Sequence, residues 1–174
     1  MKTYRVVAGD SELVADLRSS VHPIHARSNE LRGEITGEFD DDGRLNLKAP
    51  HGGSIEVSVA TITSGNRLND IEMQRRAEIK RYPLLRFSVR DVRRADADGS
   101  YRGTLIVDAH GRSRTVEAAF TLALEGSWLK LQGEHTFDMR DFGVQPPRIL
   151  TLKVEPDVKV RVRLLAEETD GGPR

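Results

Sequence analysis

The sequence predicts an all-β protein, an antiparallel up-and-down barrel of about eight strands that carries one helix. Apolar residues occupy every second position over much of the 174 residues, as in residues 31–39. Such alternation is typical of strands with one buried and one solvated face. Short turn sequences separate these runs, so neighbouring strands are expected to pair antiparallel. A double-sheet sandwich is the main competing architecture.

The composition fits one folded domain and argues against several classes of partner. Basic and acidic residues balance at 27 each, so charge gives no argument for a nucleic acid or an anionic membrane surface. The chain has no cysteine, which excludes disulfides and thiolate metal sites and is compatible with the cytoplasm. No apolar run approaches the roughly 18 residues of a membrane span. Residues 1–10 show no secretory leader. We therefore expect a cytoplasmic protein with no nucleic-acid partner.

The first part of the chain contains one weak and two clear strand patterns. Residues 13–17 alternate weakly before the segment from His22 to His25 interrupts them. Residues 31–39 form a strong strand that ends in an acidic turn with Gly43. A shorter strand is expected at 44–48, and alternation resumes at 55–59.

The helix is expected at residues 68–80, where the period of two is lost. This stretch is rich in Glu, Arg and Lys and poor in β-branched residues. Asn69 or Asp70 can cap its start, and Tyr82-Pro83 stops it because the residue before proline disfavours helical geometry. One side is expected to rest on the sheet or close a barrel end: Leu68, Ile71, Glu72, Arg75 and Ile79.

The second part of the chain returns to alternation and predicts a series of strands. The runs cover residues 85–89, 101–109, 116–124, 129–139 and 158–164. Val92 breaks the register of the first run, which predicts a β-bulge near Asp91. The irregular segment 140–147 follows the fourth run, and Phe142 is expected to plug a barrel end there.

Glycines fall on the apolar face of several predicted strands, at positions 33, 37, 103 and 133. A glycine there removes side-chain volume from the interior or lets the strand bend sharply. The pattern therefore supports two interpretations, room for a ligand inside the barrel or bends that help the barrel close.

Several segments in order resemble the YceI-like family, over roughly residues 30–165. They are ELRGEITGEFD (30–40), SVATITSGNRLND (58–70), IKRYPLLRF (79–87), GTLIVDAHG (103–111), RDFGV (140–144) and the closing run 158–164. The resemblance implies a lipocalin-like barrel domain over residues 1–166 with a long apolar cavity. It also implies an isoprenoid or other long-chain lipid as partner, and a homodimer. The polar tail 167–174 is expected to be disordered.

The chain departs from the family pattern near one mouth of the barrel. Gly9-Asp10-Ser11 lacks the usual histidine, and Asn69-Asp70 stands where the family carries Arg-Asp. Residues 21–29 also match poorly. A head group bound at this mouth is therefore expected to differ from the usual one of the family.

The predicted apolar face supplies the candidate ligand-binding residues. They line a lipid tunnel or, in the alternative interpretation, fill an ordinary core: Leu31, Ile35, Phe39, Ile55, Val57, Phe87, Leu105, Val107, Phe120, Leu122, Leu131, Phe137, Val160 and Val162. His135 and Tyr101 add polar groups that bond a ligand inside the barrel or serve only the fold.

No catalytic or metal-binding pattern stands out in the sequence. It contains no Gly-x-Ser-x-Gly elbow, and His22 with His25 supplies too few ligands for zinc. No cofactor is expected.

The sequence thus predicts a non-enzymatic protein that sequesters or carries a long-chain isoprenoid lipid, such as a quinone or its precursor. Two alternatives stay open. One is a small barrel enzyme that acts on a lipid-like substrate, with His135 or a tyrosine as acid and base. The other is a ligand-free structural or stress-response module.

Overall fold

The computed structural model describes residues 1–149 and 152–169. Its helices are the 3-10 turns η1 (Val59–Thr61) and η2 (Met139–Phe142) and the α-helix α1 (Arg67–Arg76). Its strands are β1 (Lys2–Val6), β2 (Glu12–Ser19), β3 (Ile24–Ser28), β4 (Leu31–Gly37), β5 (Gly52–Ser58), β6 (Leu84–Arg94), β7 (Ser100–Ala109), β8 (Arg112–Glu125), β9 (Trp128–Asp138), β10 (Arg148–Ile149) and β11 (Leu152–Glu168).

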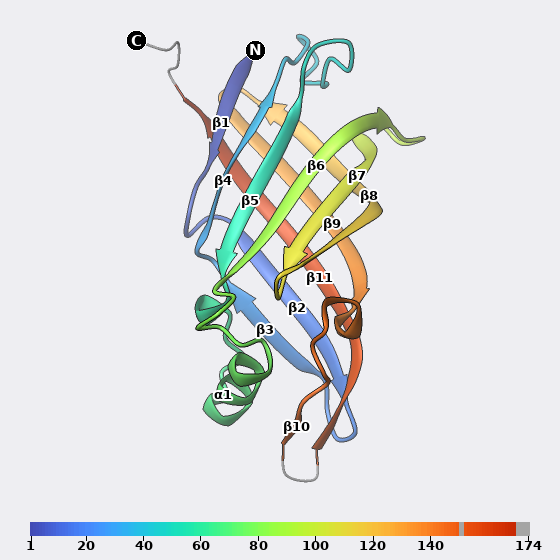
Figure 1. Ribbon diagram of the computed structural model, residues 1–174. Coiled ribbons are helices and arrows are strands. Elements are labelled where there is room, and N and C mark those ends of the chain that lie inside the picture. The colour runs from blue at the N-terminus through green and yellow to red at the C-terminus, as the bar shows by residue number, and fades with distance from the viewer. Residues whose placement is uncertain (150–151, 170–174) are drawn as a thin grey trace.

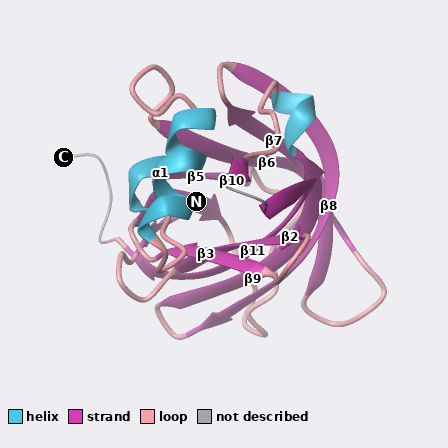
Figure 2. Cartoon of the chain, turned by 90° about the horizontal axis from the view of Figure 1, so that it is seen from below, coloured by secondary structure: helices cyan, strands magenta, loops and turns pink. Residues whose placement is uncertain are grey.

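Eight antiparallel strands close into a barrel, which confirms the predicted fold class. The order is β1-β4-β5-β6-β7-β8-β9-β11, and β11 returns to pair with β1 through Val6 and Ala166. We call the end with the β4–β5 loop the upper end and the end with α1 and β10 the lower end (Figure 1). Seen from below, α1 lies to one side of the ring of strands (Figure 2).

The connection between β1 and β2 departs from a simple meander. β1 pairs with β4 rather than with β2, and the β2–β3 hairpin extends the sheet beyond β11. The 17 residues of β11 make this arrangement possible, because β11 pairs with β2 along its middle and with β1 near its end.

Several short elements differ from the predictions. β1, β3 and β10 contain 5, 5 and 2 residues and were not predicted, since so few residues carry little periodicity. The strand expected at 44–48 is reduced to one bridge between Phe39 and Leu45. The bulge predicted near Asp91 is present, as a shift of register between Arg90 and Arg93.

The ends of α1 also differ from the prediction. Asn66, and not Asn69 or Asp70, caps the helix, since its Oδ1 accepts two backbone N–H bonds of 3.1 and 3.2 Å. The helix ends at Arg76, whereas the prediction continued it to residue 80. Turns occupy residues 77–81 instead.

Two glycines of β4 allow close approach rather than room for a ligand. A Cβ on Gly33 would overlap the Ser54 carbonyl oxygen on the neighbouring strand β5. A Cβ on Gly37 would lie 2.7 Å from Cδ1 of Leu45, which already fills that space. Of the two interpretations, the structure therefore supports barrel closure at both positions.

Strand β11 extends into the segment that was expected to be a disordered tail. Glu167 and Glu168 belong to β11 and pair with Arg5 and Tyr4, so the strand continues two positions past residue 166. The remainder of the predicted tail, residues 170–174, lies outside the described residues.

Candidate ligand-binding cavities

Two cavities lie end to end inside the barrel. The upper cavity lies among β4 to β9 and β11, and the lower cavity is bordered by β2, β3, α1 and η2. Phe87, Phe137 and Val160 line both, and we call these three residues the waist. The space open to the centre of a water molecule is about 130 Å³ in the upper cavity and about 210 Å³ in the lower. The side chains of the waist therefore form the wall between the two cavities.

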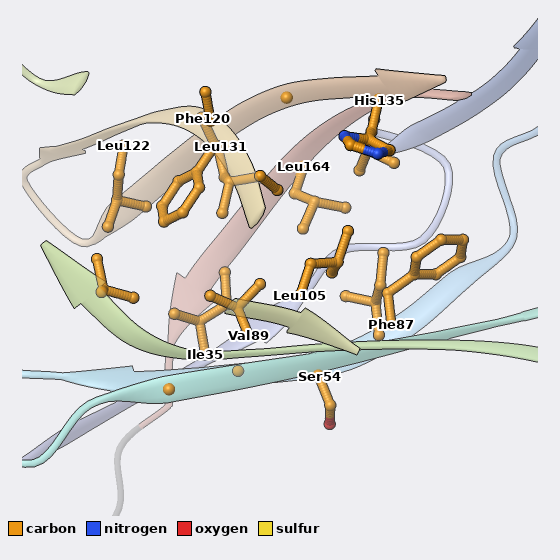
Figure 3. A pocket seen from close by; sticks show the side chains of 18 of the residues that line it. Ile35, Ser54, Phe87, Val89, Leu105, Phe120, Leu122, Leu131, His135 and Leu164 are labelled. Atoms are coloured by element: carbon orange, nitrogen blue, oxygen red, sulfur yellow. The ribbon is translucent and has the colours of Figure 1, made fainter. Parts of the chain in front are cut away.

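The upper cavity has almost entirely apolar walls. Alternate residues of each strand point inward, so one face of β6 to β9 supplies Leu, Val and Phe side chains. Figure 3 shows Phe120 and Leu122 at one end of this cavity and His135 and Phe87 at the other. Walls of this kind suit a hydrocarbon tail better than a polar ligand.

Most residues of the predicted apolar face line a cavity. Ten residues and His135 line the upper cavity, and Val107 lines the lower one. The ten are Ile35, Ile55, Phe87, Leu105, Phe120, Leu122, Leu131, Phe137, Val160 and Val162. Their role in binding remains a prediction.

Three predicted apolar residues line neither of the two cavities. Leu31 and Val57 are packed in the core with 0% and 1% of their surface exposed. Phe39 packs edge-on against Tyr4, with 5.5 Å between the ring centroids. These three side chains support the barrel wall, as the filled-core interpretation proposed for them.

Tyr101 also lies outside both cavities and has a structural partner. Its hydroxyl oxygen accepts a hydrogen bond of 3.1 Å from the backbone N–H of Leu45. Its ring stacks on Phe120 at 5.9 Å between centroids. Tyr101 therefore fastens the β4–β5 loop over the upper end, where Leu45 is buried.

His135 is the predicted polar residue that does face the upper cavity. It lies on β9 and packs against Phe137, with 4.7 Å between ring centroids. Among the described residues, the hydrogen bonds of histidine rings belong to the other four histidines, so the ring nitrogens of His135 have no protein partner there. The side chain is half-buried, so water can reach it.

The barrel wall has a seam between β8 and β9 beside this histidine. The ladder between the two strands ends at the pair of Phe120 and Gly133. Below that pair β8 is bonded only to β7, and β9 only to β11. Ala118 and Ala119 on one side of the seam and His135 on the other line the upper cavity.

The lower cavity was missed by the sequence analysis. The weak alternation of Leu13, Ala15 and Leu17 pointed to it, and all three residues line it. Met139, which ends the alternating run 129–139, lines it too, whereas Met73 of α1 carries no periodic pattern and reaches the cavity only through the tertiary fold. Phe142, predicted to plug a barrel end, is buried and lines this cavity.

Polar side chains from α1 and from Ser64, which precedes it, form one wall of the lower cavity. Asp70 Oδ1 accepts hydrogen bonds from the N–H and the hydroxyl of Ser64, at 2.8 and 2.6 Å. Asn69 and Gln74 line the same wall. No Lys or Arg from the described part of the chain lines this cavity.

The predicted helix side is reversed with respect to the barrel. Leu68 and Ile71, which were expected to face the sheet, are 65% and 50% exposed. Asn69 is only 7% exposed. The prediction was wrong because it assumed an apolar contact, whereas α1 turns polar side chains toward the lower cavity.

The histidines of the β2–β3 region lie outside the cavities. His25 Nδ1 lies 2.5 Å from Asp16 Oδ1, and Arg161 donates to the same carboxylate at 2.7 Å. The hydrogen bond from Arg161 is the largest cause that lowers the pKa of Asp16. Within residues 1–149 and 152–169, no three His, Asp or Glu side chains are grouped to hold a metal ion. None of the helices in these ranges is long and apolar enough to cross a membrane.

A closed antiparallel barrel around apolar cavities is the architecture of lipocalin-like proteins. The family model described as YceI-like domain matches residues 5–166, so the chain belongs to the YceI-like family. A search of curated protein sequences finds no match.

Solved structures similar to this chain share its fold at low identity. BcnA of Burkholderia cenocepacia is 18% identical with a TM-score of 0.76, covering 92% of this chain and 98% of its own. A polyisoprenoid binding domain from Saccharophagus degradans is 13% identical with a TM-score of 0.71, covering 95% and 98%. The YceI protein of Campylobacter jejuni is 13% identical with a TM-score of 0.60, covering 79% and 82%.

Proposed function

We propose that this protein binds one long-chain isoprenoid-type lipid, such as a quinone or its precursor, inside the barrel and catalyses no reaction on it. The observation that carries this proposal is the pair of apolar cavities that meet at the waist. Burial of each methylene group contributes about 0.8 kcal/mol. A tail that passes from one cavity to the other therefore binds firmly without any charged contact.

The comparisons support a lipid of this class. The Saccharophagus degradans domain, which shares the fold, is described as polyisoprenoid binding. A single protein that encloses such a tail can sequester the lipid or carry it between membranes. A homodimer and a cytoplasmic location remain predictions, and light scattering of the purified protein tests the first.

The alternatives make different use of the same barrel. A ligand-free module would need a barrel filled by its own side chains, and the two cavities argue against that. An enzyme would need a reactive group in the cavity, for which His135 is the candidate. Turnover that is lost in His135→Ala, with lipid binding kept, would favour the enzyme.

Extraction of the natively purified protein tests the proposal directly. We expect organic extraction and mass spectrometry to recover an apolar lipid from the wild type. Leu131→Trp fills the upper cavity, and the matched control Lys130→Trp points outward from the same strand. We expect the lipid to be lost from Leu131→Trp and kept in Lys130→Trp. A wild type that carries no lipid and binds none when incubated with geranylgeraniol would contradict the proposal.

A further inference from the structure

Helix α1 faces the lower cavity with three polar side chains and one apolar side chain, Met73. A helix that packs on a barrel normally buries its apolar side and exposes its polar side. Here Leu68 and Ile71 are exposed, and Asn69, Asp70 and Gln74 line the lower cavity. The other walls of that cavity are mostly apolar, so the polar side chains on the α1 side need an explanation of their own.

Asn69 is the least exposed polar side chain of this wall. Only 7% of its surface is exposed, and it lines the lower cavity. Its backbone N–H is used by the cap residue Asn66, but its side-chain amide has no hydrogen-bond partner in the described ranges. Its amide atoms are not fully enclosed, since the Tyr4 hydroxyl is the one completely buried side-chain polar atom without a partner among the described residues. The amide is therefore mostly shielded from solvent but can still meet an atom in the cavity, and such a group gains from a hydrogen bond. A polar atom of a ligand in the lower cavity would satisfy it.

The charges around Asn69 restrict what that ligand atom can be. Asp70 lines the cavity, and its carboxylate is held by Ser64 beside Asn69. No cationic side chain from the described residues lines the cavity to balance it. A phosphate or carboxylate head group would therefore lie next to a carboxylate in a poorly solvated space, which is unfavourable. A carbonyl or hydroxyl group fits, because an asparagine amide both donates and accepts hydrogen bonds.

We propose that Asn69 binds the head group of the lipid, that this head group is an uncharged carbonyl or hydroxyl, and that the tail runs past the waist into the upper cavity. The inference rests on the proposed function for the presence of the lipid itself. His135 is the other polar side chain on a cavity wall, but it is half-buried and stacks on Phe137. It lies along the path of the tail, where solvent can satisfy its nitrogens.

Three ligands that share an isoprenoid chain test the head-group class. Geranylgeraniol carries a hydroxyl, geranylgeranyl phosphate carries an anion, and phytane carries no head group. Displacement of a fluorescent lipid probe from delipidated protein measures each affinity. We expect the wild type to bind the alcohol at least about tenfold more tightly than the phosphate.

Substitution of Asn69 tests the residue. In Asn69→Leu the affinity for the alcohol should fall roughly three- to tenfold, toward that for phytane, while binding of phytane is kept. Without ligand, the same variant should melt at a temperature equal to or higher than that of the wild type, because leucine replaces a mostly buried amide that has no protein partner among the described residues. If Asn69→Leu does not fold, Asn69→Ala is measured in its place. The control Leu68→Ala, at an exposed position of the same helix, should keep the wild-type preference for the alcohol.

The possible failures can be told apart. Equal affinity for the alcohol and the phosphate, or a preference lost in His135→Ala and kept in Asn69→Leu, would overturn the head-group inference alone. A wild type that binds none of the three ligands would overturn the proposed function and this inference with it.

Discussion

Two buried tyrosines differ in what their hydroxyl groups contact. Tyr4 and Tyr101 have 0% and 2% of their surface exposed. The hydroxyl of Tyr101 accepts the N–H of Leu45, whereas that of Tyr4 has no partner among the described residues. Burial raises the pKa of Tyr4, so its phenol stays protonated. The hydroxyl of Tyr101 thus holds the β4–β5 loop, whereas the hydroxyl of Tyr4 stays unpaired among the described residues.

The two tyrosines form a matched pair for mutation. Tyr101→Phe leaves the buried N–H of Leu45 unpaired and should lower the free energy of unfolding by about 1–2 kcal/mol. Tyr4→Phe removes an unpaired hydroxyl and should be neutral or stabilising. Urea unfolding followed by circular dichroism measures both changes. A larger loss in Tyr4→Phe than in Tyr101→Phe would show that Tyr4 has a partner.

At the scale of elements, Asp16 connects three strands outside the barrel core. It lies on β2 and bonds to His25 of β3 and, through both carboxylate oxygens, to Arg161 of β11. These bonds hold the pKa of Asp16 below its ordinary value of 3.8, with Arg161 as the largest cause. A lowered carboxyl pKa means that the folded state favours the charged form, so the contribution is present above about pH 4 and lost as the pH falls further.

The pH dependence of Asp16→Asn tests this connection. At neutral pH the variant should be less stable than the wild type by up to about 1 kcal/mol, since the partners are partly exposed. The difference should shrink as the pH falls below about 4, where Asp16 of the wild type takes up its proton. Thermal melts across pH measure it, with Asp41→Asn in an exposed turn as control. A difference that does not change with pH would contradict the argument.

Because of the seam, β8 has different hydrogen-bonded neighbours along its length. Residues 112–119 are paired only with β7, Phe120 and Thr121 are paired with both neighbours, and residues 122–125 are paired with β9. Strand edges with fewer hydrogen bonds open more readily. We therefore expect the seam to open more readily than the paired part of the wall.

Hydrogen exchange can locate this opening. Amides of residues 113–119 that point away from β7 should exchange faster than the amides of residues 120–125 that point toward β9. The reason is that the latter have partners on β9. Exchange followed by NMR resolves the two groups, and β7, which is paired on both sides, serves as the internal reference. Equal protection along β8 would contradict a weakened seam.

At the scale of the whole molecule, the waist decides whether one ligand can occupy both cavities. Phe87, Phe137 and Val160 come from three different strands and line both cavities. Their separation depends on how the barrel closes and not on any one strand. A long tail must pass between these side chains, whereas a short one fits within a single cavity.

Enlarging a waist residue should therefore select by chain length. Val160→Phe should weaken binding of geranylgeraniol by about tenfold or more, since part of the tail loses its burial. Binding of the shorter geraniol should change little. Probe displacement measures both affinities, and Val158→Phe, placed at the lower cavity alone, is the control for added bulk. Equal losses for both alcohols in Val160→Phe would contradict a continuous channel.

Long alternating strands could be predicted from the sequence, because the alternation of apolar and polar residues within each strand shows which side chains face the interior. Residues 31–39 and 158–164 lie in or beside strands that were expected, and the bulge near Asp91 follows from a single break in register. β1 and β3 could not be predicted in the same way. Their pairing depends on β4, β11 and β2, which local patterns do not encode.

The sequence by itself determined the barrel, its apolar interior and its family, since a period of two and ordered motifs are local properties. Only the tertiary structure decided that Gly33 serves strand contact and that Tyr101 holds a loop. It also decided that Asn69 of α1 faces a second cavity. The orientation of a helix and the position of two cavities next to each other depend on contacts between distant segments, so no single stretch of sequence determines them.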